Sequence, residues 1–199
     1  MSAGHNLKEV RGIKNRSNHL KLFKLCSKLM MQIVEGNKPV IAKVHGAAYA
    51  AGCQLAASCD LAYSTNSATF ATPGVKIGLF CSTPMVAVSR KISRKRMMEM
   101  LLTGDPISAK YAKEIGLIND HYSPKTLNKK VLDIAKKISS KSNLTIKIGK
   151  KCFYKQLEMP LSKAYKYTSE MMTLNMMAKD AKEGITAFLE KRPAKWRHK

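Results

Sequence analysis

Residues 39–60 read PVIAKVHGAAYAAGCQLAASCD, and the rest of the chain is organised around this stretch. An apolar run at 40–44, bounded by Pro39 and Gly46, predicts a buried strand. The small residues at 46–52 predict a turn, and residues 53–59 predict the start of a tightly packed helix. Because the first amides of a helix have no partner within it, this order of elements presents free backbone N–H groups at one point.

Such a turn has two interpretations. Free N–H groups at a helix start can hold an anion or stabilise a developing oxyanion, and small side chains let a ligand approach the backbone closely. The alternative is that the small residues only allow a helix to pack closely on a sheet. This stretch alone leaves both interpretations open.

Length and composition predict one domain with room for a helical appendage. The chain has 199 residues, of which 45% are hydrophobic, enough for a sizeable core. It has no apolar run long enough to cross a membrane, and its first residues, MSAGHNLKEVRGIK, contain no apolar signal-peptide segment. The sequence therefore predicts a soluble intracellular protein.

The cysteine pattern predicts reduced, structural thiols. The number is odd and no pair has the CxxC spacing; the cysteines are Cys26, Cys53, Cys59, Cys81 and Cys152. Cysteine among small residues behaves as a small apolar filler. Metal binding is therefore not expected.

The net charge of +23 has three interpretations, namely nucleic-acid binding, an anionic small ligand, or a general preference for lysine. Lysines are spread along the whole chain, and the densest basic cluster, RKISRKR at 90–96, contains no aromatic residue. The distribution favours the general preference. Nucleic-acid binding is not expected as the main role.

The pattern of apolar and turn residues predicts short β/α units up to about Ser108 and mainly helix afterwards. A loop is expected at 13–19, and a buried loop or short strand at 75–84. Strands are expected at 60–64, 67–71 and 117–122. Helices are expected at 20–34, at 85–100 with a break at 91–94, at 109–115 with Ser108 as N-cap, at 127–139, and at 144–190 with a break at Pro160.

A second small-residue turn, SAGHNLKE at 2–9, leads into a short helix near the N-terminus. Taken with other motifs in a fixed order, it identifies a family resemblance. The other motifs are HGAAYAAGCQLAASCD at 45–60, FATPGV at 70–75, GLFCSTP at 78–84, LTGDPISA at 102–109 and EGITAFLEKR at 183–192. The chain resembles the crotonase (enoyl-CoA hydratase/isomerase) superfamily over nearly its whole length.

The resemblance implies an α/β fold, a crotonase-type spiral of β/α turns followed by a C-terminal helical region. The implied domains are a partial core at 1–122 and a helical trimerisation region at 123–199. In the family several strands precede the SAGH motif, so the resemblance implies an N-terminally truncated core. The implied assembly is a homotrimer or a dimer of trimers.

The resemblance also implies the ligand and its site. The ligand is an acyl-CoA thioester of fatty-acid or lipid metabolism, with no cofactor and no metal. The implied location is the mitochondrial matrix in a eukaryote or the cytoplasm in a bacterium. The thioester oxygen is held by the backbone N–H groups of His5 and Ala51. The implied substrate-binding residues are Ala3, His5, Asn6, Leu7, Ala51, Gly52 and Cys81.

The chain departs from the family at both hydratase glutamates, whose motif positions hold Gln54 and Gly74. Neither residue exchanges a proton near neutral pH, so ordinary hydration is expected to be very weak. Other candidates for proton transfer are His5, Cys81, Ser82 and Thr83, each of which also fits plain loop packing. Asp60 is expected to cap structure.

The sequence leaves two main functions open, together with a less favoured third, RNA binding driven by the positive charge. The first is an acyl-CoA-binding protein, hydratase- or isomerase-like, that lacks the hydratase acid/base pair and carries out enolate or thioester chemistry. The alternative is a non-catalytic module that binds acyl-CoA or a protein partner.

Overall fold

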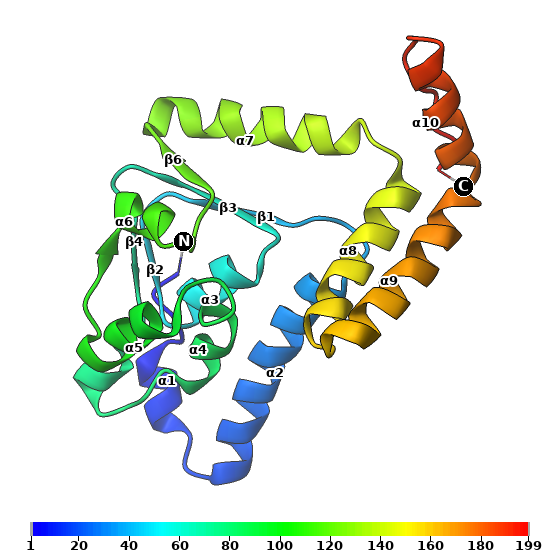
Figure 1. Ribbon diagram of the computed structural model, residues 1–199. Coiled ribbons are helices and arrows are strands. Elements are labelled where there is room, and N and C mark those ends of the chain that lie inside the picture. Colours follow the sequence, from blue (N-terminus) through cyan, green and yellow to red (C-terminus); the bar gives the residue numbers. More distant parts are fainter. Residues whose placement is uncertain (1, 199) are drawn as a thin grey trace. The chain divides into compact units, whose positions relative to one another are not determined.

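The computed structural model describes residues 2–198, which form two compact units (Figure 1). One unit comprises the chain up to Val34 together with Val40–Leu132, and the other comprises Glu35–Pro39 with the chain from Asp133 onward. No helix among residues 2–198 is both long and apolar enough to cross a membrane. The predicted trimerisation role of the C-terminal region stays a prediction.

The first unit contains two small sheets, and the first four strands alternate between them along the chain. The first sheet is parallel, with the order β1 (Ile41–Val44), β3 (Leu61–Thr65) and β6 (Asp120–Tyr122). The second has the order β2 (Ala47–Tyr49), β4 (Thr69–Ala71) and β5 (Ile107–Ser108), with β5 antiparallel to β4. Because β1 pairs with β3 and β2 with β4, each turn of the chain contributes one strand to each sheet, as a spiral of β/α turns requires.

The helices of this unit connect the strands and surround them (Figure 1). They are α1 (Leu7–Gly12), α2 (Arg16–Glu35), α3 (Ala51–Ser58), the 3₁₀ helix η1 (Pro73–Ile77), α4 (Ser82–Val88), α5 (Arg94–Thr103) and α6 (Ala109–Glu114). Helix α7 (Pro124–Ser139) begins in this unit and ends in the other. Helix α6 begins at its predicted cap, since the Ser108 side chain accepts a hydrogen bond from the N–H of Tyr111.

Helix α3 lies in the centre of the core because its residues are small. Six of its eight residues are buried, and it packs against α4. The largest fully buried side chains around it include Val44 on β1, Phe70 on β4 and Val88 on α4. Small side chains on α3 therefore do allow the close packing that the sequence left as an alternative interpretation.

Four sequence predictions about local structure were wrong. The turn predicted at 46–52 contains strand β2, and the loop or strand predicted at 75–84 contains most of η1 and the start of α4. Helix α2 begins at Arg16, inside the predicted loop 13–19. The helix predicted at 144–190 is broken a second time, at residues 177–178. In each case, tertiary pairing or packing outweighed a weak local preference.

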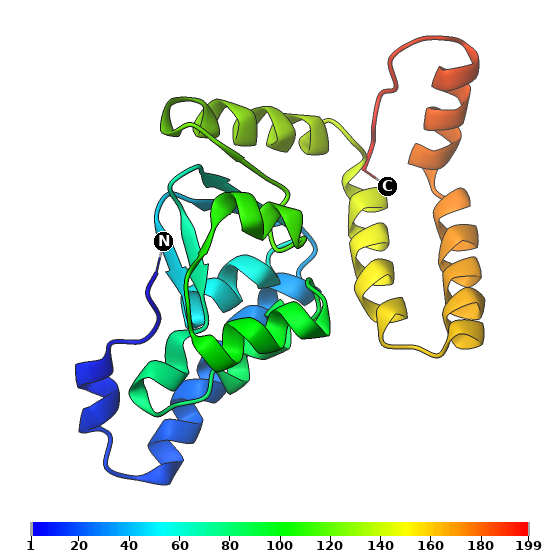
Figure 2. The ribbon, with the colours of Figure 1, turned by 60° about the vertical axis from the view of Figure 1, so that its left-hand side comes forward.

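The second unit contains the three helices α8 (Asn143–Leu157), α9 (Leu161–Met176) and α10 (Lys179–Leu189). Figure 2 shows α8 and α9 side by side and antiparallel, with the tail after α10 folding back along the unit. The break between α8 and α9 falls at the predicted Pro160, which precedes the first residue of α9.

Asp180, at the start of α10, anchors the returning tail. Its side chain is 1% exposed and accepts hydrogen bonds from the Ser142 hydroxyl, from the N–H of Arg197 at 2.7 Å and from the N–H of His198 at 3.0 Å. Burial alone would raise the pKa of this carboxyl, but the hydrogen bonds outweigh it and lower the pKa. The ionised carboxylate is therefore the form that holds the tail.

Replacing Asp180 with asparagine is expected to lower the melting temperature by about 5 °C at neutral pH, since two backbone donors lose a charged acceptor. Because the folded-state pKa is depressed, this stabilisation is present above the unfolded pKa near 4 and is lost as pH falls through the folded pKa. Thermal unfolding at neutral and strongly acidic pH measures both effects. Asp133→Asn, an exposed position on α7, is the matched control, and an equal loss in both variants would contradict the assignment.

Candidate functional site

The two small-residue turns that the sequence singles out lie directly against each other. The N–H of Tyr49 donates to the carbonyl oxygen of Ser2 at 2.9 Å. Gly52 faces the same carbonyl so closely that a Cβ there would lie 2.0 Å from the Ser2 oxygen. Gly4 has a φ of 105°, and a Cβ on it would lie 3.1 Å from Ala50 Cβ. Glycines at 4 and 52 are therefore required for the contact.

The backbone is strained where α3 begins. Ala50, the N-cap, has φ 48° and ψ −117°, a conformation that residues with a Cβ rarely adopt. Its N–H is anchored by the carbonyl oxygen of Ala71 at 3.0 Å. Strain of this kind is characteristic of functional sites, where the surrounding structure holds it in place.

The backbone N–H of Ala51, the residue after the strained Ala50, has no hydrogen-bond acceptor among residues 2–198. Ala51 is the first residue of α3, and its N–H donates to no residue between 2 and 198; the same holds for the N–H of His5. A Cβ on Gly4, the neighbour of His5, would lie 3.6 Å from the Ala51 nitrogen. The two predicted donors thus belong to adjoining segments, while their role as an oxyanion hole stays a prediction.

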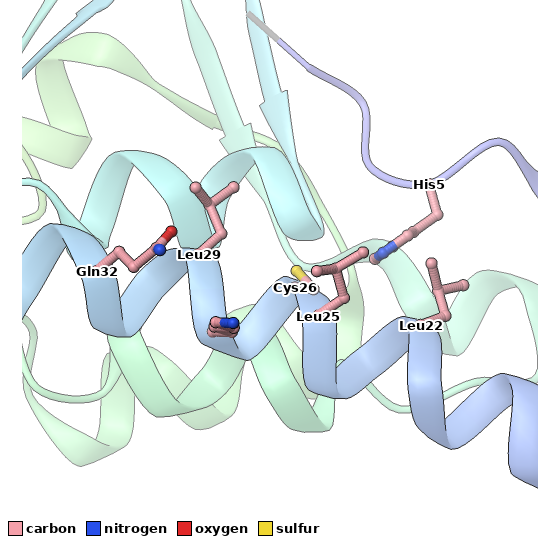
Figure 3. Close-up of a pocket in the computed structure, with 7 residues that line it drawn as sticks. His5, Leu22, Leu25, Cys26, Leu29 and Gln32 are labelled. Atoms are coloured by element: carbon pink, nitrogen blue, oxygen red, sulfur yellow. The ribbon is translucent and has the colours of Figure 1, made fainter.

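A groove with a volume of about 500 Å³ runs along α2 and reaches His5 (Figure 3). It is lined by His5, Leu22, Leu25, Cys26, Lys28, Leu29 and Gln32. The His5 ring meets the Phe23 ring edge-on, with centroids 5.9 Å apart. Four of these seven lining residues, Leu22, Leu25, Cys26 and Leu29, are apolar, as is typical of small-molecule pockets. Of the predicted substrate-binding residues, only His5 lines the groove.

Gln54, which the sequence predicts at the first glutamate position, is buried at 4% exposure. The Cys26 thiol on α2 lies 3.8 Å from Gln54 Oε1 and donates a long S–H···O hydrogen bond to it. Burial raises the pKa of the Cys26 thiol, so the thiol keeps its proton at neutral pH. Gln54 is therefore joined through Cys26 to the wall of the α2 groove.

Gly74, which the sequence predicts at the second glutamate position, has no space for a side chain. A Cβ on Gly74 would lie 2.7 Å from the carbonyl oxygen of Leu79 and 3.0 Å from Cys81 Sγ. The N–H of Gly74 donates to Cys81 Sγ at 3.3 Å. Burial raises the pKa of the Cys81 thiol, although this N–H partly lowers it. Burial, together with Cys81, raises the pKa of Cys53 to about 12. Both thiols are neutral at pH 7, so neither is an activated base or nucleophile.

The other predicted residues play structural or surface parts. Asn6 caps α1 by accepting from the N–H of Lys8 at 3.1 Å, and Leu7 is 54% exposed. Ala3 is exposed as well. The Ser82 hydroxyl donates to the carbonyl oxygen of Phe80, and Asp60 accepts from the N–H of Val40 at 2.7 Å. Asp60 thus tethers the start of β1, as the sequence predicts for a structural carboxylate.

Sequence reasoning missed Cys26 as part of this region. Its position in an amphipathic helix indicated packing, and no local signal links it to Gln54, which lies 28 residues away. Among residues 2–198, no group of three or more His, Cys, Asp or Glu side chains could hold a metal ion.

The α/β spiral, the two adjoining turns and the groove define a protein of the crotonase type. The family model described as enoyl-CoA hydratase/isomerase matches residues 1–199, and the chain belongs to this family. It is 49% identical over 197 residues to human enoyl-CoA hydratase domain-containing protein 3, mitochondrial, covering 99% of this chain and 65% of the human protein. The rat protein of the same name is 48% identical, with 66% of its length covered. The chain thus spans just under two thirds of these relatives.

Solved structures support the same fold. An enoyl-CoA hydratase from Mycobacterium smegmatis superimposes with a TM-score of 0.96 at 47% identity, covering 98% of this chain and 76% of that chain. The human enoyl coenzyme A hydratase domain-containing protein 3 superimposes with a TM-score of 0.95 at 48% identity, covering 98% and 77%. The predicted family and fold class are both confirmed.

Proposed function

We propose that this protein binds an acyl thioester of coenzyme A, whose carbonyl oxygen accepts hydrogen bonds from the N–H groups of His5 and Ala51. The observation that carries the proposal is the direct contact of residues 2–4 with residues 49–52, which brings two amides that have no acceptor among residues 2–198 into adjoining segments. Two such donors stabilise the negative charge that gathers on a thioester oxygen as an enolate forms. The net charge of +23 favours an anionic ligand such as coenzyme A.

The chemistry that the site supports is enolate or thioester chemistry without ordinary hydration. Gln54 does not act as a base, and no side chain fits at position 74. The proposed role of the protein is in fatty-acid or lipid metabolism. The second candidate is a module that binds acyl-CoA, or a protein, without turnover. The neutral Cys53 and Cys81 thiols favour this candidate, because neither supplies a ready base.

Assembly and location belong to the same proposal. Helices α9 and α10 and the residue that caps α9 carry strongly exposed apolar side chains, including Leu161 at 74%, Met177 at 71% and Phe188 at 82%. Exposed apolar surface of this kind is typical of subunit interfaces, and we propose that it is buried in a homotrimer or a dimer of trimers. The relatives named mitochondrial suggest the mitochondrial matrix if the source is a eukaryote, and the cytoplasm if it is a bacterium.

Ala51→Pro tests the proposed donor directly. Proline removes the N–H at the first position of a helix, where it is otherwise well tolerated. The dissociation constant for an acyl-CoA, measured by calorimetry, is expected to rise at least about tenfold. Lys179→Pro, at the first position of α10, is the matched control and should bind normally. If a stably folded Ala51→Pro protein binds with unchanged affinity, Ala51 is not a donor to the ligand.

A further inference from the structure

The positive charge of the chain is concentrated on its first two helices. Residues 8–28 carry a net charge of +6 over 21 residues, whereas the whole chain carries +23 over 199. The charge density of this segment is therefore more than twice the average, which exceeds what a general preference for lysine gives. Its basic residues are Lys8, Arg11, Lys14, Arg16, Lys21, Lys24 and Lys28, and its single acidic residue is Glu9.

Helix α2 presents part of this charge to solvent. Among its 20 residues, all of which the structure describes, only Met30 is buried. Lys21, Lys24 and Lys28 are exposed and are spaced by three and four residues, so they form a lysine stripe along one face of the helix. Within residues 2–198, no acidic side chain forms an ion pair with a basic residue of the segment 8–28. The lysine stripe therefore remains available to an external anionic surface.

Exposed apolar side chains flank the lysine stripe on both sides. Leu25 and Leu29 follow one edge, with exposed fractions of 67% and 47%. Leu20 and Met31 follow the other edge, with exposed fractions of 44% and 49%. The methylene stems of the lysines extend this apolar surface, while their charged ends stay in water. A helix that combines lysines with exposed leucines in this way is typical of helices that lie in a membrane interface.

The composition of this face distinguishes between possible partners. A second copy of the chain would bring the same positive charge to the contact, and like charges repel. A nucleic acid would neutralise the lysines but leave the leucines in water, and base stacking needs free aromatic rings. Phe23, the only Phe, Tyr or Trp of α2, already meets the His5 ring edge-on. Anionic phospholipids match both components, because they offer phosphates to the lysines and hydrocarbon to the leucines.

We propose that α2 docks the protein on a membrane surface that contains anionic phospholipids. The lysine stripe contacts the lipid phosphates, and the flanking apolar side chains enter the headgroup layer, with the helix lying in the plane of the surface. Leu25, Lys28 and Leu29 also line the groove that reaches His5, so docking brings this groove to the lipid surface. The inference is independent of the proposed acyl-CoA binding, because docking requires no coenzyme A ester.

The full chain is tested by co-sedimentation with vesicles of phosphatidylcholine alone and of phosphatidylcholine mixed with phosphatidylglycerol. Binding is expected only to the mixed vesicles, and it should fall steeply as salt is added. Lys21→Gln combined with Lys24→Gln should lower the partition coefficient about thirtyfold, since each lysine near an anionic surface contributes about a factor of five. Lys147→Gln combined with Lys151→Gln, at exposed positions of α8, removes the same charge and should lower it less than about threefold.

A second pair of variants tests the apolar flank. Leu20→Ser combined with Met31→Ser, at positions outside the groove, should lower binding to the mixed vesicles about tenfold, because less apolar surface enters the headgroup layer. The matched control is Leu102→Ser combined with Met98→Ser on α5, where the exposed fractions are 63% and 46%. This control should bind the mixed vesicles as the original protein does.

The outcomes separate this inference from the proposed function. If the folded protein ignores the mixed vesicles, or if both lysine pairs matter equally, α2 is not a membrane-docking helix, and calorimetry with an acyl-CoA still decides the proposed function. If the protein binds a single-stranded RNA in preference to the vesicles and the Lys21→Gln, Lys24→Gln variant releases it, the face belongs to nucleic acid and the inference is wrong. Melting temperatures show whether each variant is folded when it is measured.

Discussion

Crotonyl-CoA should be hydrated at least about 10⁴-fold more slowly by this protein than by a family hydratase that carries both glutamates. Each acid or base group contributes about 10²–10⁴-fold to such a reaction, and the sequence predicts that both are missing here. Gln54 holds one position, and Gly74 holds the other. The rate is measured by the loss of the enoyl thioester under identical conditions for both proteins.

Restoring the glutamates separately should not restore hydration. Gln54→Glu fits the space of the glutamine, but it supplies only one of the two groups. Gly74→Glu places a Cβ 2.7 Å from the Leu79 carbonyl oxygen and 3.0 Å from Cys81 Sγ, so the segment before α4 has to move. Overpacking of this kind typically costs about 1–3 kcal/mol of stability. A hydration rate within tenfold of the two-glutamate enzyme, abolished by Gln54→Ala, would overturn the claim that hydration is lost.

Gly52→Ala should weaken acyl-CoA binding by about a hundredfold or more. Even a methyl group at this position would lie 2.0 Å from the Ser2 carbonyl oxygen and 2.8 Å from its carbon. Both are backbone atoms, so the N-terminal segment has to move away, taking the His5 N–H and its side of the groove with it. The loss of one preorganised donor already costs about 2.7–4 kcal/mol in comparable sites.

The matched control for this prediction is Gly149→Ala on α8. Gly149 is exposed, and a Cβ there would meet nothing within 4 Å. Alanine in an exposed helix interior stabilises the helix by up to about 1 kcal/mol relative to glycine, so this variant should fold and bind normally. Calorimetry and thermal unfolding of both variants give the comparison. Normal binding by Gly52→Ala would show that the contact between the two turns is not part of the ligand site.

Regular elements with strong local patterns could be predicted from the sequence. The strand at 40–44, the helix cap at Ser108 and the break at Pro160 all occur as their residue types predict. Strand β2 could not be predicted in this way, because Ala47–Tyr49 has no apolar alternation and becomes a strand only through its parallel pairing with β4. The start of α4 at Ser82 was likewise hidden by Gly78 and Pro84.

The candidate site, too, could be predicted only in part from the sequence. The two small-residue turns and the missing glutamates can be identified in the sequence, because each is carried by a contiguous motif. The contact between Cys26 and Gln54 and the closed space at Gly74 depend on segments that are distant along the chain or folded back on themselves. No local pattern encodes them.

The sequence by itself therefore determined the family and the α/β class, and it predicted the absence of a hydratase acid/base pair, since these depend on which residues occupy fixed motif positions. Only the tertiary structure decided that the turn at 2–4 packs on the turn at 49–52, that the Ala50 backbone is strained, and that the Cys26 thiol donates to the Gln54 side chain. These properties arise from distances and hydrogen bonds between separate segments, and such distances exist only once the chain has folded.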